Sequence, residues 1–234
     1  KKLVANDGSF SQHSLNYHRM VLDTLACAEI CRKRFEQPAF SAFFYKKASL
    51  STSWLYQMIS ATTGDGPNLG ANDGTKLLPL TDCDYRDYRP SVQLSMALFQ
   101  NCQAYEKNGL WDTHLLWLNV SKPTQKAPSF SDCNYDQGGY KILRFGNASV
   151  FFRFPRFNFR PSQADALHVD LWVRGLNLLA DAGTFSYNSS PDMAWYFNGT
   201  VSHNTIEFDG RDQMPKLGRF LFGNWLKTWL NLWK

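Results

Sequence analysis

The spacing of apolar residues changes near the middle of this 234-residue chain, and this change constrains its fold more than any other feature. In the first half, apolar residues recur at the three- and four-residue spacing of one helix face. In the second half they alternate with polar residues, which is typical of strands. Because the helices come first and the strands second, we predict two separate units and not an alternating α/β fold.

The predicted helices all precede residue 122. Ser9 or Ser11 can serve as the N-cap of the first helix. Pro38 lies just before the second helix, and Pro90 just before the third, where proline suits a helix start. A loop at 62–74, rich in Gly, Asn and Asp, separates the second helix from the third, because these residues favour turns. We expect helices at about 11–35, 39–59, 91–105 and 111–118.

Strands are predicted after residues 123–138, a segment rich in Pro, Ser and Asp that we interpret as a linker. The first two strands form a hairpin across a Gly-Asn turn at 146–147. In a later strand, the alternation places His168, Asp170 and Trp172 on one face. We expect strands at 140–145, 149–154, 166–173, 176–180 and 201–208.

The composition is that of a globular protein, with 44% hydrophobic and 19% charged residues. The formal net charge of +5 suits an acidic ligand. The only close basic group, at 32–34, lies at a predicted helix end, where it complements the helix dipole, so we predict no nucleic-acid partner. Five cysteines without a framework spacing argue against a disulfide scaffold, and no transmembrane run is present. The 15% aromatic residues are explained by core packing and would also suit a carbohydrate groove.

Three polar residues in the strand region are candidate metal ligands. His168 lies within a predicted strand, Asp181 ends the next one, and His203 lies near the start of the last. Zinc accepts two imidazoles and a carboxylate and can keep a fourth position for water or substrate. A ligating histidine needs a partner for its second ring nitrogen, which Asp170 or Asn204 could provide. From spacing alone, hydrogen-bonded histidines and an ordinary turn at Asp181 explain the same residues.

Several ordered motifs carry a family resemblance that covers nearly the whole chain. The runs ALHVDLWVRGLNLLADAGTFSY at 166–187, SHNTI at 202–206 and DGRDQM at 209–214 resemble the β-sheet domain of heparinase II/III-like proteins. The runs DGSFSQHSLNYHRMVLD at 7–23 and NLGANDG at 68–74 resemble the late helices of the (α/α) toroid in that family.

The resemblance implies an α+β multidomain fold, with the C-terminal part of an (α/α) toroid followed by the start of an antiparallel β-sandwich. Residues 1–122 are then the toroid portion, 123–138 the linker and 139–234 the sandwich portion. The chain is expected to be a piece from the middle of such a protein. The family also implies a structural Zn²⁺ near the active-site cleft, and its H-x-D, D-x-G and H-N-T motifs assign the ligands to His168, Asp181 and His203.

The implied activity is that of a polysaccharide lyase, which cleaves a uronate-containing polysaccharide by β-elimination. The uronate C5 proton is weakly acidic, so the carboxylate must be neutralised, a base must remove the proton, and an acid must protonate the leaving oxygen. The resemblance places Asn16, Tyr17 and His18 in the matching helical region. We predict Asn16 as the carboxylate-neutralising donor and His18 or Tyr17 as the proton-transfer residue. Adjacent residues of a helix point about 100° apart, so all three are not expected to face one cleft unless the helix is interrupted.

Two positions depart from the family pattern. Ala166 stands where characterised lyases of this kind usually carry a catalytic histidine, and the family's catalytic tyrosine has only Tyr56 as a candidate here. The loop before the third helix offers Asn68, Asn72 and Asp73 instead.

These departures keep alternatives open. Ala166 favours a non-catalytic glycan-binding or polysaccharide-assembly protein that retains the lyase fold and the zinc site. A hydrolase would need two carboxylates across a cleft, and nothing in the sequence pairs Asp165, Asp170 or Asp181 at a scissile bond. The expected partner is an acidic polysaccharide, and the family implies a periplasmic or secreted protein, although this chain carries no recognisable signal peptide.

Overall fold

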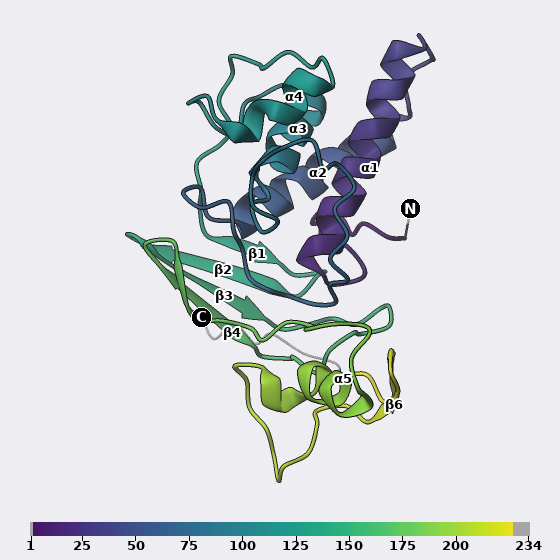
Figure 1. Ribbon diagram of the computed structural model, residues 1–234, viewed down its shortest axis with the longest axis vertical. Coiled ribbons are helices and arrows are strands. Elements are labelled where there is room, and N and C mark those ends of the chain that lie inside the picture. Colours follow the sequence, from purple (N-terminus) through teal and green to yellow (C-terminus); the bar gives the residue numbers. More distant parts are fainter. Residues whose placement is uncertain (1, 227–234) are drawn as a thin grey trace.

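The structure, a computed structural model, describes residues 2–226. It combines helices in the first half with an antiparallel sheet in the second, and Figure 1 shows α1–α4 on one side of the sheet and α5 and β6 on the other. The helices are α1 (Leu15–Arg34), α2 (Ala42–Met58), α3 (Arg89–Gln100), η1 (Leu110–Asp112), α4 (Thr113–Trp117), α5 (Pro191–Asn198) and η2 (Thr200–Ser202). The strands are β1 (Cys133–Tyr135), β2 (Tyr140–Phe145), β3 (Ala148–Arg153), β4 (Val169–Val173), β5 (Leu176–Leu179), β6 (Lys216–Gly218) and β7 (Leu221–Phe222).

The four predicted helices of the first half are confirmed, with shifted ends. The cap of α1 is Ser14, and the prediction of Ser9 or Ser11 was wrong. The Ser14 hydroxyl accepts a hydrogen bond from the Tyr17 backbone N–H at 3.1 Å, which satisfies one of the free donors at the helix start. Ser41 caps α2 in the same way, so this helix begins later than expected.

The sheet has the strand order β1-β2-β3-β4-β5, and all neighbours are antiparallel. The predicted hairpin of β2 and β3 is confirmed, with Ile142 opposite Phe151 and Phe145 opposite Ala148. The alternation predicted for β4 is also confirmed, because Asp170 and Trp172 are buried while their neighbours are partly exposed.

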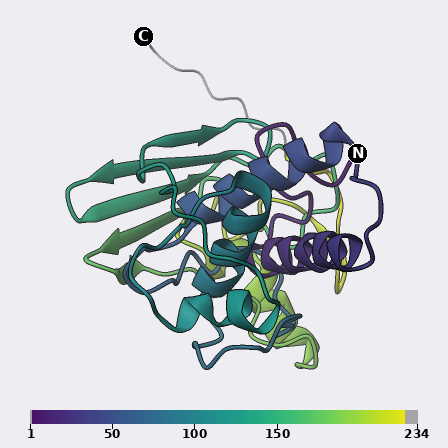
Figure 2. The same ribbon diagram turned by 90° about the horizontal axis from the view of Figure 1, so that it is seen from above.

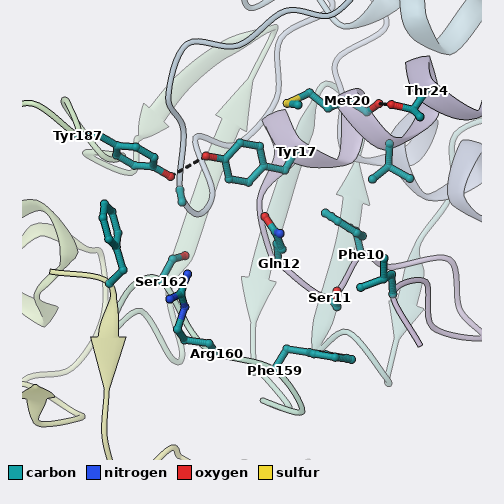
Figure 3. A pocket seen from close by; sticks show the side chains of 14 residues that line it. Phe10, Ser11, Gln12, Tyr17, Met20, Thr24, Phe159, Arg160, Ser162 and Tyr187 are labelled. Carbon is teal, nitrogen blue, oxygen red and sulfur yellow. Dashed lines mark hydrogen bonds between the residues drawn. The ribbon is translucent and has the colours of Figure 1, made fainter. Parts of the chain in front are cut away.

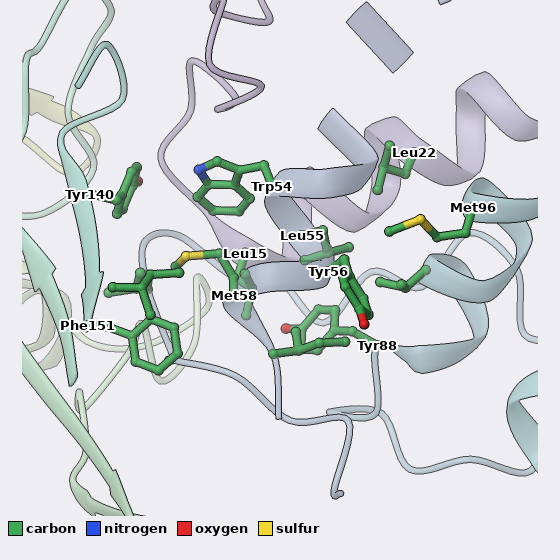
Figure 4. Close-up of a cluster of buried hydrophobic side chains, with 14 of the residues drawn as sticks. Leu15, Leu22, Trp54, Leu55, Tyr56, Met58, Tyr88, Met96, Tyr140 and Phe151 are labelled. Atoms are coloured by element: carbon green, nitrogen blue, oxygen red, sulfur yellow. The ribbon is translucent and has the colours of Figure 1, made fainter. Parts of the chain in front are cut away.

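One hydrophobic cluster joins the helices to the sheet. In Figure 4, Trp54 and Met58 of α2 face Tyr140 and Phe151 of the sheet. The rings of Trp54 and Tyr140 meet edge to face with their centroids 5.3 Å apart, a favourable aromatic geometry. Viewed from the helical side in Figure 2, the strands extend beyond the helices at one edge. The helical part and the sheet therefore share a core, although the sequence predicts separate units.

The strand predicted at 201–208 is wrong. The chain instead forms η2 and then turns without joining a sheet, apart from a single bridge between Phe208 and Arg211. The Asp212 carboxylate accepts a hydrogen bond from the Thr200 backbone N–H at 2.7 Å, and the Thr200 hydroxyl accepts one from Gln213. These bonds fold the segment back on itself, which alternation of side chains could not reveal.

Other elements were not predicted. The short strand β1 lies inside the predicted linker and pairs with β2. Helix α5 starts at Pro191, behind the cap Ser190, whose hydroxyl accepts from the Met193 backbone N–H. None of the helices within residues 2–226 has the length and apolar character needed to cross a membrane.

Candidate metal centre and cleft

The three predicted ligands His168, Asp181 and His203 converge on one point. His168 lies just before β4, Asp181 follows β5, and His203 follows η2. All three side chains are buried, and one potential ligand atom from each lies within 4.8 Å of the other two. This cluster could hold a metal ion.

The Asp181 carboxylate lies between the two imidazoles. Its Oδ2 is 3.0 Å from Nδ1 of His203 and 3.6 Å from Nδ1 of His168. Its Oδ1 accepts a hydrogen bond from the Gly183 backbone N–H at 2.7 Å, so the tight turn after β5 fixes the direction of the carboxylate. Gly183 adopts a φ of +72°, a conformation that glycine reaches without steric cost.

The hydrogen bond between Asp181 and His203 shifts the pKa values of both residues. Burial raises the pKa of Asp181, but the hydrogen bond from His203 and the two imidazole charges outweigh it, so the pKa lies below its usual value. Burial lowers the pKa of His203, but the bond to Asp181 outweighs it in the other direction, so this pKa is raised. Both shifts favour the charged forms of the two residues.

The remaining contacts fit a metal site. Nε2 of His168 is buried, lies 3.7 Å from Oδ2 of Asp170, and has no hydrogen-bond partner among residues 2–226. The Asn204 backbone N–H donates to Nδ1 of His168 at 3.1 Å, so of the two expected partners Asn204 is the one that makes a hydrogen bond to this ring. Nε2 of His203 is buried and has no hydrogen-bond partner among residues 2–226. Two imidazoles and one carboxylate with an unsatisfied ring nitrogen are a donor set that zinc accepts.

A buried ion pair lies next to the cluster of His168, Asp181 and His203. The guanidinium of Arg153 lies 2.7 Å from the carboxylate of Asp165, and both side chains are almost fully buried. The Arg153 backbone N–H also donates to the carbonyl of His168 at 2.9 Å. Asp165 is therefore committed to an ion pair.

A cleft of about 670 Å³ lies between α1 and the loops of the second half. Figure 3 shows Tyr17 of α1 reaching across it to Tyr187 of the loop after β5, and their hydroxyl oxygens are 2.7 Å apart. The lining residues include Phe10, Gln12, Tyr17, Arg160, Ser162 and Tyr187. Of the candidate catalytic and metal-binding residues named from the sequence, Tyr17 alone lines this cleft within the described part of the chain.

Burial is the largest influence on the pKa of both phenols. Burial, the hydrogen bond to Tyr187 and the nearby Asp73 carboxylate all raise the pKa of Tyr17 far above its usual value. Burial also raises the pKa of Tyr187, but the hydrogen bond from Tyr17 and the positive charge of Arg160 oppose this rise. Both pKa values lie above the usual value of a phenol, and the positive charge of Arg160 opposes this rise at Tyr187.

The neighbours of Tyr17 on α1 point elsewhere. His18 is fully buried, its Nε2 lies 2.8 Å from both the carbonyl and the hydroxyl oxygens of Ser51, and its ring stacks on Trp54 at 4.4 Å. Burial lowers the pKa of His18 to about 4. Asn16 is buried as well, and its side-chain oxygen accepts from Arg19 at 2.5 Å.

The loop before α3 docks directly on the turn that carries Asp181. The Asn68 side chain donates to the carbonyl of Asp181 at 3.5 Å, and the Asn72 backbone N–H donates to the Thr184 hydroxyl at 3.1 Å. Asn68, Asn72 and Asp73 line a second cleft of about 640 Å³, to which Tyr187 also contributes. Tyr56 lies in the core against Phe130, with ring centroids 4.4 Å apart.

Ala166, the residue at the position of the family's usual catalytic histidine, is held by Gln213. Its side chain is buried, its backbone N–H donates to the Gln213 side chain at 2.9 Å, and its carbonyl accepts from Gln213 at 3.0 Å.

Three residues that line the cleft were not predicted from the sequence: Tyr187, Arg160 and Ser162. Tyr187 lies at the end of the quoted motif at 166–187, which was the only available signal for it.

Comparison with known proteins finds a family model that matches the second part of the chain. Residues 127–232 match the family model described as heparinase II/III-like, C-terminal. Among solved structures 20 chains match. The heparan sulfate lyase HepC from Pedobacter heparinus aligns with a TM-score of 0.65 and 19% identity, covering 92% of this chain and 32% of that one. No curated protein matches the sequence.

Two further structures agree. A heparinase III gene product aligns with a TM-score of 0.64 and 16% identity, covering 91% of this chain and 31% of its own. The crystal structure of heparinase III aligns with a TM-score of 0.63 and 15% identity, covering 90% of this chain and 33% of its own. This chain thus spans 31–33% of the length of these proteins, and at such identities the likeness shows the fold.

Proposed function

We propose that this chain, whose residues 127–232 belong to the heparinase II/III-like family, acts as a polysaccharide lyase on an acidic, uronate-containing polysaccharide. The observation that carries the proposal is the hydrogen-bonded pair of Tyr17 and Tyr187 in a cleft large enough for sugar residues. The two phenols come from opposite halves of the fold and meet at a distance of 2.7 Å. The pair supplies both proton-transfer groups that an elimination needs.

The positive charge of Arg160, which opposes the rise in the pKa of Tyr187, favours Tyr187 as the base. Tyr187, as the phenolate, removes the C5 proton of the uronate; the electron pair of that C–H bond forms the C4–C5 double bond, and the C4–O4 bond breaks. Tyr17 donates its proton to the departing O4. A proton then passes from Tyr187 to Tyr17 along their hydrogen bond, which restores both residues without water.

Tyr17 is a better proton-transfer candidate than His18. A general acid or base must come within hydrogen-bond reach of the substrate. His18 has no exposed surface and is held by Ser51 and Trp54. Its direct role, like that of Asn16, stays a prediction from the sequence, and their contacts support a role in fixing the first turns of α1.

We further propose that His168, Asp181 and His203 hold a structural zinc ion. Bound there, zinc would stabilise the junction between β4, the turn after β5 and the segment after η2, without taking part in the elimination. Because Tyr187 lies six residues beyond Asp181, the same site would position the loop that carries this phenol.

Metal analysis tests this site. Purified protein should contain about one equivalent of zinc. The variant His203→Ala should lose it, whereas His114→Ala, which removes a buried histidine outside the cluster, should keep it. A folded, metal-free wild-type protein would contradict the proposal.

The second face of the sheet supports the β-sandwich of the family. Leu143, Val150 and Leu171 lie opposite one another across β2, β3 and β4, and Leu179 follows on β5. Leu143 is 46% exposed and Leu179 43% exposed. A sheet that is apolar on both faces needs a covering layer on each, so we propose that a second sheet packs here. We likewise propose that residues 1–122 are part of an (α/α) toroid.

Ultraviolet absorbance tests the reaction, because elimination creates a conjugated, unsaturated uronate. The protein should raise the absorbance of at least one uronate polymer in a panel. Tyr17→Phe and Tyr187→Phe should each lower the rate about 100- to 10,000-fold. The control Tyr196→Phe changes a half-exposed tyrosine of α5 that lines neither cleft, and it should keep the rate.

A second function is favoured by Ala166, where a catalytic histidine is usual in the family. If the protein binds a uronate polymer without any rise in absorbance, it is a glycan-binding protein that retains the lyase fold, and the lyase proposal fails.

A further inference from the structure

Arg160 is the only charged residue that lines the Tyr17–Tyr187 cleft in the described part of the chain. It lies on the segment between β3 and β4 and is exposed. Figure 3 shows it beside Ser162 on the wall near Tyr187. A cation in an otherwise neutral cleft attracts an anionic group of the ligand.

Most other arginines are already committed to a carboxylate. Arg153 pairs with Asp165, Arg86 with Asp65 and Arg89 with Asp87. Within residues 2–226, no ion pair or hydrogen bond of Arg160 is found, so its five N–H donors remain available for a ligand. The guanidinium presents these donors in a planar fork that matches both oxygens of a carboxylate.

A second polar group beside it is also unsatisfied. The Ser162 hydroxyl is buried in the cleft wall and has no hydrogen-bond partner among the described residues. A buried hydroxyl without a partner is unfavourable, and a ligand oxygen that accepts its hydrogen would satisfy it. Gln12, on the segment before α1, adds an amide to the lining of the same cleft.

We propose that Arg160, assisted by Ser162, binds the carboxylate of the uronate whose C5 proton faces Tyr187. This inference rests on the proposed function and assigns the neutralising role, predicted for Asn16, to a residue that lines the cleft. By pairing with the carboxylate, Arg160 stabilises the negative charge that spreads onto it as the proton leaves C5. The same contact makes Arg160 the residue that distinguishes an acidic sugar from a neutral one.

Variants of Arg160 test the assignment in the intact protein. Arg160→Gln should lower kcat about 100- to 1000-fold, as when one stabilising donor is removed from an anionic transition state. Arg160→Lys should retain part of the rate, because it keeps the charge but not the fork. The control Arg211→Gln removes an arginine that is 77% exposed and paired with Asp209, and it should leave the rate unchanged.

Binding measurements separate this proposal from the lyase proposal. Wild-type protein should bind a uronate polymer at least tenfold more tightly than the same polymer with its carboxyls reduced to alcohols. Arg160→Gln should lose this preference and bind the reduced polymer as the wild type does. This result would support the role of Arg160 even if no polymer gave an absorbance rise, in which case the lyase proposal alone would fail.

Three results would overturn the assignment. The variant Arg160→Gln could keep the preference for the carboxylated polymer, or it could lose affinity equally for both polymers. Alternatively, wild-type binding could survive carboxyl reduction but disappear on removal of sulfate groups, which would show that the cleft recognises sulfate.

Discussion

Replacing Gly183 by alanine tests how closely the turn beside the candidate metal centre is held against the helical part. A Cβ at this position would lie 2.0 Å from the side-chain nitrogen of Asn68. Asn68 cannot move freely, because its side-chain oxygen accepts from Arg86 at 3.0 Å and its nitrogen donates to the carbonyl of Asp181. The Gly183 backbone N–H also orients the Asp181 carboxylate.

The expected destabilisation has three parts. The positive φ of Gly183 costs an alanine about 1–2 kcal/mol. The overlap with Asn68 adds about 1–3 kcal/mol, as in other overpacked sites. The reduced freedom of the unfolded chain offsets about 0.4–1 kcal/mol. We therefore expect Gly183→Ala to lower the free energy of unfolding by about 1–5 kcal/mol in total.

The control is Gly146→Ala in the β2–β3 turn. Gly146 has a φ of +55°, but no atom lies within 4 Å of the added Cβ. Its destabilisation should be about 1.5 kcal/mol or less, because the strain and the unfolded-state effect are the same as for Gly183 and the overlap is absent. The difference between the two variants measures the overlap.

Urea unfolding of the wild type and the variants provides the assay. In Asn68→Ala/Gly183→Ala the overlap is removed, so the double variant should be more stable than the sum of the single effects predicts. Zinc content should fall in Gly183→Ala and stay unchanged in Gly146→Ala. Equal stability losses for the two glycine variants, with no coupling to Asn68, would refute the reasoning.

Three further predictions concern buried groups. Burial raises the pKa of Asp23 from 3.8 to about 6, so the folded state holds this proton more tightly than the unfolded state, and the wild type should lose up to about 3 kcal/mol of stability as the pH rises from 4 to 7. Asp23→Asn should lack this loss, as urea unfolding at both pH values would show; parallel pH profiles would contradict it. Arg153→Gln leaves Asp165 as an unpaired buried charge and should lower the free energy of unfolding by about 3–5 kcal/mol, and an effect below about 1 kcal/mol in the same assay would argue against the ion pair. Phe151→Ala should cost about 3–5 kcal/mol in thermal or urea unfolding, because the ring lies in the shared core; a surface-like loss of less than about 0.5 kcal/mol would disprove that packing.

Local signals in the sequence were sufficient for much of the fold. The helices of the first half follow from apolar spacing, and the β2–β3 hairpin follows from its Gly-Asn turn, because both depend on residues close in sequence. The strand expected at 201–208 failed because Asp212 and Gln213 hold Thr200 in a turn. Alternation describes side chains but cannot show which backbone groups have found other partners.

Some features of the candidate site could be predicted from the sequence, and others could not. The convergence of His168, Asp181 and His203 could be predicted because the family motifs mark each residue, and the structure brings them together. The burial of His18 depends on Ser51 and Trp54, which belong to another helix, so its own sequence neighbours gave no sign of it. Tyr187 meets Tyr17 across 170 positions of sequence, a pairing that no local pattern encodes.

The shared core has a practical consequence for dissecting this protein. The border between helices and strands in the sequence lies near residues 123–138, yet Trp54 and Met58 on one side of it are buried by Tyr140 and Phe151 on the other. A polypeptide cut in that segment would expose both aromatic surfaces to water and would tend to aggregate. The two halves should instead survive proteolytic nicking of the segment, provided that they remain associated, and elute together on gel filtration.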